Sequence, residues 1–248
     1  MKKSITIFII VACLWGCIDM YAFNPIKEIA FYTKDSIKIS ATYEYPEINK
    51  STIPAIILIH QGGSSREEWL DLPLWNDLKA AGYALLAIDL RQHGKSAKDT
   101  GDIYDLFNNP NRAPLDLLAA IEFLKKDKHI DVERIGIIGA SIGGNLACVA
   151  ASSREYAIKS AVSLSAKTSA AQNLSGQKEP IVPKNVFYIA SKEEQNGLRK
   201  EWSNELYGKT KGERKVEIAS GDKHGSFILR KEKRLQEAIV YWFENTLK

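Results

Sequence analysis

Cysteine is scarce in this 248-residue sequence, which contains only three, and two of them, Cys13 and Cys17, lie close to the N-terminus. Cys148 alone remains in the body of the chain, so an internal disulfide framework is excluded. Because it lies in an apolar segment expected to be helical, residues 145–151, we expect a buried thiol that packs as a small hydrophobe. No Cys-x-x-Cys or His-x-x-x-His pair is present, so we expect neither a metal nor another cofactor.

An excess of charge of one sign is also missing. The 34 Lys and Arg residues nearly balance the 30 Asp and Glu residues, and the net charge of +4 falls further if Lys2 and Lys3 are removed with a leader. This balance argues against a nucleic-acid partner. The basic stretch 209–215 is interrupted by glycine and glutamate, which is typical of a solvated surface segment.

The N-terminus has the pattern of an export signal. Lys2 and Lys3 precede an uncharged apolar run over residues 4–18, which Asp19 ends. The run is too short for an ordinary membrane-spanning helix but fits the hydrophobic region of a signal peptide. We therefore expect residues 1–22 to form a signal peptide or lipoprotein signal, residues 23–248 to form one folded domain, and the protein to be exported.

The way in which the leader is processed has more than one solution. Gly16-Cys17 resembles the lipobox of bacterial lipoproteins, in which a small residue precedes an acylated cysteine. Cys17 is therefore the lipidation candidate, with Cys13 as the alternative, and acylation would anchor the protein to a membrane through an N-terminal lipid. Cleavage near Ala22, which would release a soluble exported protein, and an uncleaved anchor are the other possibilities.

The body of the chain alternates between strand and helix patterns without internal repeats. Continuous apolar runs such as 55–59 and 84–88 predict strands that are covered on both faces. Alternating strands and helices predict an α/β fold with a mostly parallel central sheet and helices on both faces. The expected strands are 36–45, 55–59, 84–88, 134–138, 158–164, 186–190 and 216–219, and the expected helices include 74–81, 113–126, 145–151, 193–207 and 231–246. Only 19 residues, 166–184, lie where a helical cap could be inserted, so we expect little or no cap and an open, shallow site.

A serine motif follows one of these strands. Residues 139–144 read Gly-Ala-Ser-Ile-Gly-Gly and match the G-x-S-x-G nucleophile elbow. A turn this sharp strains the backbone at the serine, and glycines on both sides relieve the crowding. The turn exposes the Ser141 oxygen at the edge of the sheet and directs the Ile142 N–H to the same place, beside a helix N-terminus.

A second motif ends the apolar strand 55–59. Residues 58–63 read Leu-Ile-His-Gln-Gly-Gly and resemble the His-Gly-rich turn of lipases and esterases, which supplies an oxyanion donor. By position the donor is the Gly62 N–H, with Gln61 as the alternative. His60 itself fits a buried, hydrogen-bonding role. Residues 89–96, Asp-Leu-Arg-Gln-His-Gly-Lys-Ser, look like the D-x-R-G-x-G-x-S loop of the same enzymes, where the role is mainly to brace neighbouring loops, so His93 is a poor candidate for catalysis.

Together these motifs resemble the α/β-hydrolase superfamily over residues 37–248, and most closely its small, lidless esterase-like and dienelactone-hydrolase-like members. Dienelactone hydrolases use a cysteine nucleophile, and because this chain has Ser141, their substrate is not carried over. The resemblance implies that the base is His224, since it follows the last expected strand and precedes the last helix. It also implies an acid between Ser141 and His224 in the sequence.

The acid is expected after the strand 186–190. In the family a G-x-x-D turn follows this strand, and alignment of Ala190 with the glycine predicts Glu193 as the acid, with Glu194 as the alternative. A glutamate can replace aspartate, because one carboxylate is enough to hold the imidazole in the correct tautomer. Asp222 lies only two residues from His224 and fits a turn residue better.

The leading functional hypothesis is hydrolysis of a small-molecule carboxylic ester. Ser141 would attack the acyl carbon, His224 would carry the proton to the leaving alcohol, and the N–H groups of Ile142 and Gly62 would bind the oxyanion. A serine peptidase of the prolyl-oligopeptidase-like type is the second possibility, although such enzymes usually carry a selector domain. A non-catalytic binding protein on the same scaffold is the third, and it would have no need for a complete serine, histidine and acid set.

Overall fold

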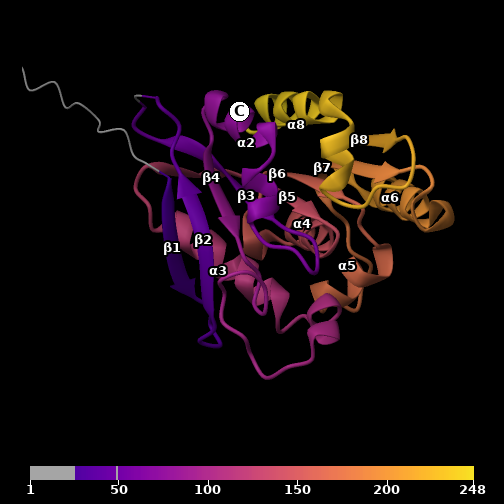
Figure 1. The fold of residues 1–248 in the computed structure, drawn as a ribbon, viewed down its shortest axis with the longest axis horizontal. Coiled ribbons are helices and arrows are strands. Elements are labelled where there is room, and N and C mark those ends of the chain that lie inside the picture. Colours follow the sequence, from indigo (N-terminus) through magenta and orange to yellow (C-terminus); the bar gives the residue numbers. More distant parts are fainter. Residues whose placement is uncertain (1–25, 49) are drawn as a thin grey trace, which may run out of the picture.

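The computed structural model describes residues 26–48 and 50–248 (Figure 1). The predicted leader, with Cys13 and Cys17, lies outside the described residues, so its processing stays a prediction. Within the described ranges, none of the helices combines the length and the apolar character needed to cross a membrane.

An eight-stranded sheet forms the centre of the described chain, with the strand order β1-β2-β4-β3-β5-β6-β7-β8. The first two strands run antiparallel to their neighbours, and the other six are parallel to one another. This arrangement confirms the predicted α/β class with its mostly parallel sheet. The strands are β1 Lys27–Tyr32, β2 Lys38–Glu44, β3 Ile53–Ile59, β4 Ala84–Ile88, β5 Ile130–Ala140, β6 Ser160–Leu164, β7 Lys184–Ser191 and β8 Lys211–Ala219.

Helices cover both faces of the sheet (Figure 1). The α-helices are α1 Glu67–Leu70, α2 Pro73–Ala80, α3 Ala113–Lys125, α4 Ile142–Ser152, α5 Thr168–Ser175, α6 Leu198–Lys209, α7 Phe227–Lys231 and α8 Lys233–Thr246. Short 3₁₀ helices are η1 Ile103–Phe107, η2 Arg154–Tyr156 and η3 Glu194–Gly197. Buried residues of α3, α4, α5 and α6 belong to one hydrophobic cluster, whereas those of α1, α2, α7 and α8 belong to another.

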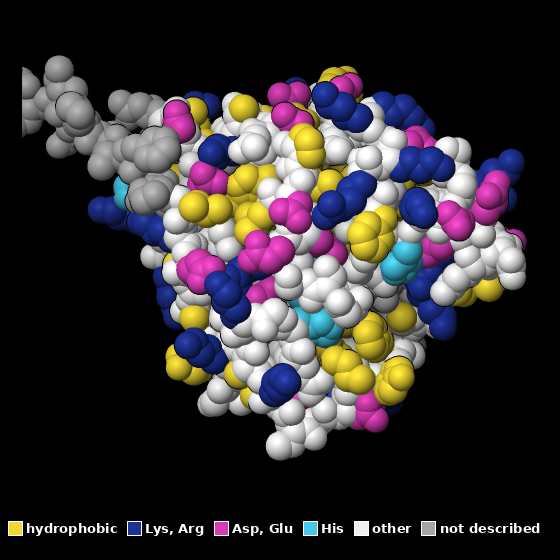
Figure 2. All heavy atoms as spheres, in the orientation of Figure 1, with side chains coloured by type: hydrophobic (Ala, Val, Ile, Leu, Met, Phe, Trp, Pro, Cys, Tyr) yellow, Lys and Arg dark blue, Asp and Glu magenta, His cyan; other side chains and the backbone are white. Residues whose placement is uncertain are grey.

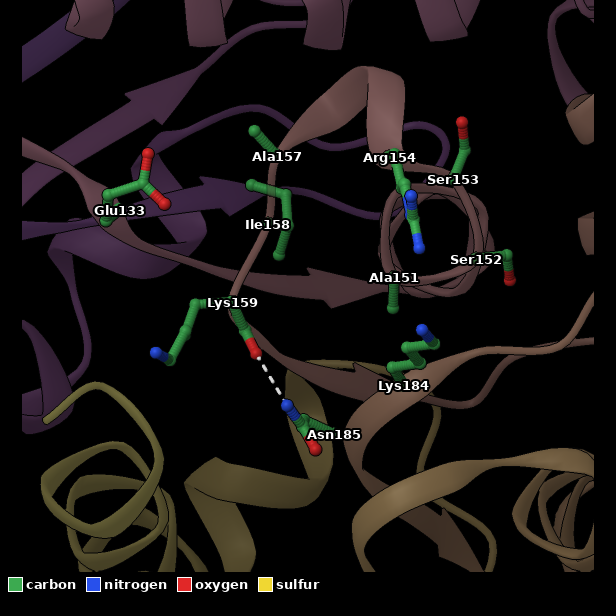
Figure 3. A pocket seen from close by; sticks show the side chains of 10 residues that line it. All are labelled: Glu133, Ala151, Ser152, Ser153, Arg154, Ala157, Ile158, Lys159, Lys184 and Asn185. Carbon is green, nitrogen blue, oxygen red and sulfur yellow. Dashed lines mark hydrogen bonds between the residues drawn. The ribbon is translucent and has the colours of Figure 1, made fainter.

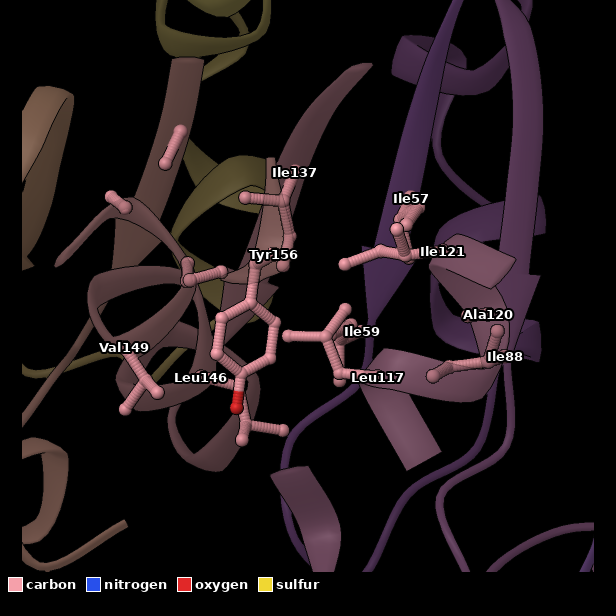
Figure 4. Packing of buried hydrophobic residues seen from close by; sticks show 14 of the residues in the cluster. Ile57, Ile59, Ile88, Leu117, Ala120, Ile121, Ile137, Leu146, Val149 and Tyr156 are labelled. Atoms are coloured by element: carbon pink, nitrogen blue, oxygen red, sulfur yellow. The ribbon is translucent and has the colours of Figure 1, made fainter. Parts of the chain in front are cut away.

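Strand β3 shows why its sequence is apolar without alternation. Its side chains point to the two faces in turn, so Ile57 and Ile59 pack into the cluster beneath α3 and α4, while Ile56 and Leu58 pack into the cluster beneath α2 and α8. Figure 4 shows the first of these clusters, in which Leu117 of α3 lies near Ile59. Burial on both faces therefore accounts for the continuous apolar run.

Several elements differ from the sequence expectations, since β5 and β8 begin earlier, at Ile130 and Lys211, and α1 and α7 were not expected. Two further differences concern the edge of the sheet and the start of α6. Strand β1, which pairs with β2 at the edge of the sheet, was not predicted. The helix expected over residues 193–207 begins only at Leu198, because Gln195, Asn196 and Gly197 have φ of 49°, 57° and 88°. Three successive residues in the left-handed region cannot belong to a right-handed α-helix.

The segment expected to be too short for a cap does contain a single short helix, α5, between β6 and β7. The absence of a large insertion there agrees with the expectation of a minimal cap. Parallel strands place their carboxyl ends at one edge of the sheet, so the loops after β3, β5, β6, β7 and β8 meet at that edge. Every predicted site residue in the described chain lies on one of these loops or at the start of α4.

The buried cluster beneath α3 predicts a large loss of stability on truncation. Ile121 is 0 % exposed, so Ile121→Ala should lower the free energy of unfolding by about 2–5 kcal/mol, from lost burial and the cavity left behind. Ile26, which is 51 % exposed, offers the matched control, and Ile26→Ala should change stability by less than about 0.5 kcal/mol. Urea unfolding of both variants measures the difference, and equal losses would contradict the described packing.

Candidate active site

The backbone at Ser141 is strained in the way that a nucleophile elbow requires. Ser141 lies between β5 and α4 with φ 54° and ψ −109°, a conformation that costs a non-glycine residue about 1–3 kcal/mol. Two hydrogen bonds hold it there, because Ser141 N–H donates to Leu164 O over 2.8 Å and Asn145 N–H donates to Ser141 O over 2.9 Å. The strain is thus sustained by β6 on one side and α4 on the other.

The neighbouring glycines are required by close contacts between backbone segments. A Cβ atom on Gly139 would lie 1.9 Å from Gly143 O, and one on Gly143 would lie 2.3 Å from Ile59 O. A Cβ on Gly144 would lie 2.6 Å from Leu164 O. Since backbone atoms cannot move aside as a flexible side chain can, any larger residue would push α4 away from β3 and β6.

The turn after β3 has three successive backbone N–H groups, of which two are hydrogen-bonded and one is not. Gln61 N–H donates to Glu68 Oε1 over 3.2 Å, and Gly63 N–H donates to His93 Nε2 over 3.1 Å. Between them, the Gly62 N–H has no hydrogen-bond acceptor among the described residues. Ile142 is the first residue of α4, where N–H groups lack partners within the helix. The Gly62 N–H is therefore available for a ligand, as are the first N–H groups of α4, which include that of Ile142, and this favours Gly62 over Gln61.

His60 and His93 brace this turn, as the sequence predicted. His60 Nε2 accepts a hydrogen bond from Leu90 N–H over 3.0 Å, and its Nδ1 lies 2.7 Å from Gln61 O. Burial lowers the pKa of His60 to about 4, so the ring is neutral at physiological pH. The buried, hydrogen-bonding role expected for His60 is confirmed, and the hydrogen bond from Gly63 gives His93 a similar one.

The loop after β4 is tied to the same turn by a buried ion pair. Asp89 accepts hydrogen bonds from the backbone N–H groups of Arg66 and Lys95, each over 2.8 Å, and its Oδ2 lies 2.7 Å from Arg66 Nη1. A Cβ atom on Gly94 would lie 2.2 Å from this carboxylate, which explains the glycine. The bracing role expected for residues 89–96 is confirmed.

The carboxylate that reaches His224 belongs to Glu194. Glu194 Oε1 lies 2.5 Å from His224 Nδ1, and the Glu194 side chain is buried, with 5 % exposure. Glu193 is exposed. The preference for Glu193 as the partner of His224 is therefore wrong, and the alternative, Glu194, holds that position. Asp222, with a side chain that is 75 % exposed, lies on the surface.

The error in register comes from the length of β7. The strand continues through Ser191, one residue beyond the predicted end, so the turn that follows is displaced by one position. Lys192 N–H then donates to Ala219 O and Glu193 N–H donates to Gly221 O, over 2.9 and 2.8 Å. These two bonds continue the pairing with the segment after β8 and leave the next residue, Glu194, to turn inward.

Two further residues contact the Glu194 carboxylate, and the sequence patterns did not reveal either. Ser165 Oγ donates to Glu194 Oε2 over 2.7 Å and accepts a hydrogen bond from Gly225 N–H over 2.9 Å. Arg199 Nε forms an ion pair with Glu194 Oε1 at 3.2 Å. Ser165 could have been suspected, because it directly follows β6 at the carboxyl edge, whereas nothing in the helical pattern of α6 marks Arg199.

The histidine loop lies against the elbow. An ideal Cβ atom on Gly225 would lie 3.3 Å from Ala140 Cβ, which places the residue after His224 beside the residue before Ser141. In the described structure no hydrogen bond joins Ser141 Oγ to His224, and such bonds are often long in free enzymes and tighten when substrate binds. The arrangement brings a half-buried serine hydroxyl, an imidazole held by a carboxylate and the N–H groups of Gly62 and Ile142 to one edge of the sheet.

The surface above this edge carries two histidine side chains with hydrophobic side chains around them (Figure 2). A separate hollow of about 390 Å³ lies elsewhere, lined by residues that include Glu133, Lys159 and Lys184 (Figure 3). Glu133 lies in the first half of β5, Lys159 just before β6 and Lys184 at the start of β7, so the hollow is at the opposite edge of the sheet. Within the described ranges, no cluster of three or more His, Cys, Asp or Glu residues could hold a metal ion.

A serine elbow at the carboxyl edge of a mostly parallel sheet, with a histidine and its carboxylate on the last loops, defines the α/β-hydrolase class. Comparison of the sequence with family models agrees, since the model described as alpha/beta hydrolase fold matches residues 54–233. The chain therefore belongs to the α/β-hydrolase fold family.

Solved structures with similar folds include enzymes that act on esters. Esterase Pf2001 of Pyrococcus furiosus has a TM-score of 0.69 and 21% identity, covering 90% of this chain and 91% of the esterase. Est1E of Butyrivibrio proteoclasticus, with ferulic acid bound, has a TM-score of 0.71 and 18% identity, covering 88% of this chain and 98% of Est1E. A dienelactone hydrolase of Anabaena variabilis has a TM-score of 0.66 and 19% identity, covering 90% and 99%. At these identities the likeness shows the fold.

Among curated sequences, an uncharacterized 31.7 kDa protein from the traX-finO intergenic region of Escherichia coli is 33% identical over 107 residues. These residues are 43% of this chain and 35% of the relative. The match thus spans about a third of that protein's length.

Glu68, which holds the Gln61 N–H, predicts a pH-dependent stability. Burial raises the pKa of Glu68 from 4.5 to about 7, so the folded state binds its proton more tightly than the unfolded state does. Stability should therefore fall as the pH rises from about 4.5 to 7, by about 1–3 kcal/mol. Glu68→Gln should abolish this part of the fall and leave the variant more stable than the original protein at pH 8. Thermal unfolding at pH 5 and pH 8 measures it, with the exposed Glu67→Gln as control, and an unchanged pH dependence in Glu68→Gln would refute the prediction.

Proposed function

We propose that this protein is a serine hydrolase that cleaves a small carboxylic ester through an acyl-enzyme intermediate. The observation that carries the proposal is the strained backbone of Ser141, with φ 54° between a strand and a helix. Such strain is sustained at sites where it contributes to function. At this site it presents the hydroxyl beside the Ile142 N–H.

The chemistry proposed for the site follows from the positions of its groups. Ser141 Oγ attacks the acyl carbon while His224 accepts its proton, and the N–H groups of Ile142 and Gly62 stabilise the negative charge that develops on the carbonyl oxygen. Glu194 holds the Nδ1 proton of His224, so that Nε2 is free to act as the base. The imidazolium then protonates the leaving alcohol, and water hydrolyses the acyl-enzyme by the same steps.

An ester of modest size is favoured by the surroundings of the oxyanion turn. A Cβ atom on Gly62 would lie 2.7 Å from the ring of Phe107, so an apolar wall from η1 stands directly beside the proposed oxyanion site. The single short helix α5 in place of a larger cap leaves this region open. The similarity to esterase Pf2001 supports the same substrate class.

We also propose that the protein is exported, with Cys17 as the acylated residue. The support for this is the sequence alone: a basic start, a short apolar run and the Gly16-Cys17 pair.

Replacement of the proposed nucleophile should abolish hydrolysis and leave folding intact. Ser141→Ala should lower kcat for p-nitrophenyl esters by about 10⁶-fold, as the loss of a triad serine does in a protease. A fluorophosphonate probe should label the original protein and not the variant, while Ser153→Ala at the opposite edge of the sheet should react like the original. Activity within about tenfold of the original in Ser141→Ala would exclude the assignment, and an unlabelled original protein would favour a binding role.

The two adjacent glutamates should differ widely in their effect on turnover. Glu194→Gln leaves the Nδ1 of His224 without its carboxylate and should lower kcat by up to about 10⁴-fold, because the imidazole loses its preferred tautomer. Glu193→Gln changes an exposed side chain and should leave kcat nearly unchanged. Steady-state kinetics of the two variants at equal folded fraction test this, and a larger loss for Glu193→Gln would contradict the described register.

A further inference from the structure

A buried arginine forms an ion pair with Glu194, the proposed acid. Arg199, the second residue of α6, is 9 % exposed, and its Nε lies 3.2 Å from Glu194 Oε1. Its Nη1 donates to Ser165 O over 2.6 Å, and its guanidinium carbon lies 5.2 Å from the centre of the Trp202 ring. The side chain is thus held from three sides, each contributed by a different segment.

The contacts form a closed ring of three residues. Arg199 bonds to the carbonyl of Ser165, the hydroxyl of Ser165 bonds to Glu194, and Glu194 pairs with Arg199. Ser165 itself has φ 51°, and the two residues after Glu194 are left-handed as well, so both segments need contacts that hold them in place. The ring supplies such contacts for both segments.

The guanidinium of Arg199 and the ring of His224 contact the same oxygen, Glu194 Oε1. Both Arg199 Nε and His224 Nδ1 face Glu194 Oε1, at 3.2 and 2.5 Å. Burial lowers the pKa of Arg199, but a guanidinium keeps its proton in proteins, so the positive charge is permanent. The charged groups placed here are Glu194, His224, Arg199 and, over the ring of Trp202, Lys167.

We propose that Arg199 is a positioning residue that fixes the Glu194 carboxylate and keeps a permanent positive charge beside the pair that Glu194 forms with His224. The inference rests on the proposed function. A carboxylate shared with a guanidinium stabilises a neighbouring imidazolium less than an unshared one does. The charge of Arg199 therefore opposes the positive charge that His224 takes up when it accepts the proton of Ser141, and its removal should alter the pH dependence of the rate.

Two substitutions at this position separate charge from geometry. Arg199→Met removes both the ion pair with Glu194 and the hydrogen bond from the charged guanidinium to Ser165 O. We expect kcat to fall about 10- to 100-fold, with KM little changed and the acidic limb moved to higher pH. Arg199→Lys keeps the charge but loses the fork that also reaches Ser165 O, so kcat should fall while the acidic limb keeps its position.

Arg214 offers a matched control, because its guanidinium also stacks on an aromatic ring, that of Tyr207, and donates to the backbone carbonyls of Tyr207 and Thr210. None of its contacts in the described structure involves Ser141, His224 or Glu194. Arg214→Met should therefore leave both kcat and the pH profile unchanged, and an equal shift in this variant would show a general electrostatic effect and overturn the proposal.

Nuclear magnetic resonance of the His224 ring makes the test independent of turnover. In Arg199→Met the ring should keep its proton to higher pH than in the original protein, and an unmoved transition would overturn the proposal even if ester hydrolysis is demonstrated. If the protein hydrolyses no ester, the proposed function fails, and the ring titration still decides whether Arg199 acts on His224. If Arg199→Met does not fold, Arg199→Lys alone tests the proposal. A displaced acidic limb or ring titration in Arg199→Lys would overturn the role of charge. An unchanged kcat in the same variant would overturn the role of geometry.

Discussion

The site depends on one close contact between backbones, at the place where β5 turns into α4. Gly139, Gly143 and Gly144 let this turn approach β3 and β6 so closely that a single added carbon would overlap a carbonyl oxygen. The approach holds Ser141 in its strained conformation with positive φ and brings the start of α4 to the edge of the sheet. This close contact also sets the positions of the Ile142 N–H and the Ser141 hydroxyl, and it allows the hydrogen bond from Ser141 N–H to Leu164 O.

Buried arginines organise the loops around that turn. Arg66 pairs with Asp89, Arg91 with Asp116, and Arg199 with Glu194. The first two pairs join residues 23 and 25 positions apart in the sequence, and the third joins the neighbouring elements η3 and α6. Breaking such a pair leaves a buried charge uncompensated, at a typical cost of about 3–5 kcal/mol. The guanidinium forks thus give the loops fixed geometry in the absence of disulfides: Cys148, in the described part of the chain, is a free, buried thiol.

Much of the fold could be predicted because its signals are local. The run 84–88 matches β4, and the boundaries of α3 agree to within a residue, since the apolar periodicity and Pro114 act within one element. Strand β1 lacks such a signal, because its side chains alternate between exposed and half-buried and depend on β2 for their pairing. The helix expected from residue 193 failed for another reason: three left-handed residues, of which two are not glycine, are stabilised by contacts outside the segment.

The sequence by itself determined the class of fold, the elbow around Ser141, the turn around Gly62 and the position of His224 after the last strand. These features follow from the spacing of glycines and from the order of the strands, both of which can be read directly from the sequence. Only the tertiary structure decided between Glu193 and Glu194, because β7 extends through Ser191 by pairing with β8. It alone also revealed Ser165 and Arg199 beside the carboxylate, since Ser165 contacts Glu194 and Arg199 across 29 and 34 positions of the sequence, and no local pattern encodes which side chain a folded loop will meet.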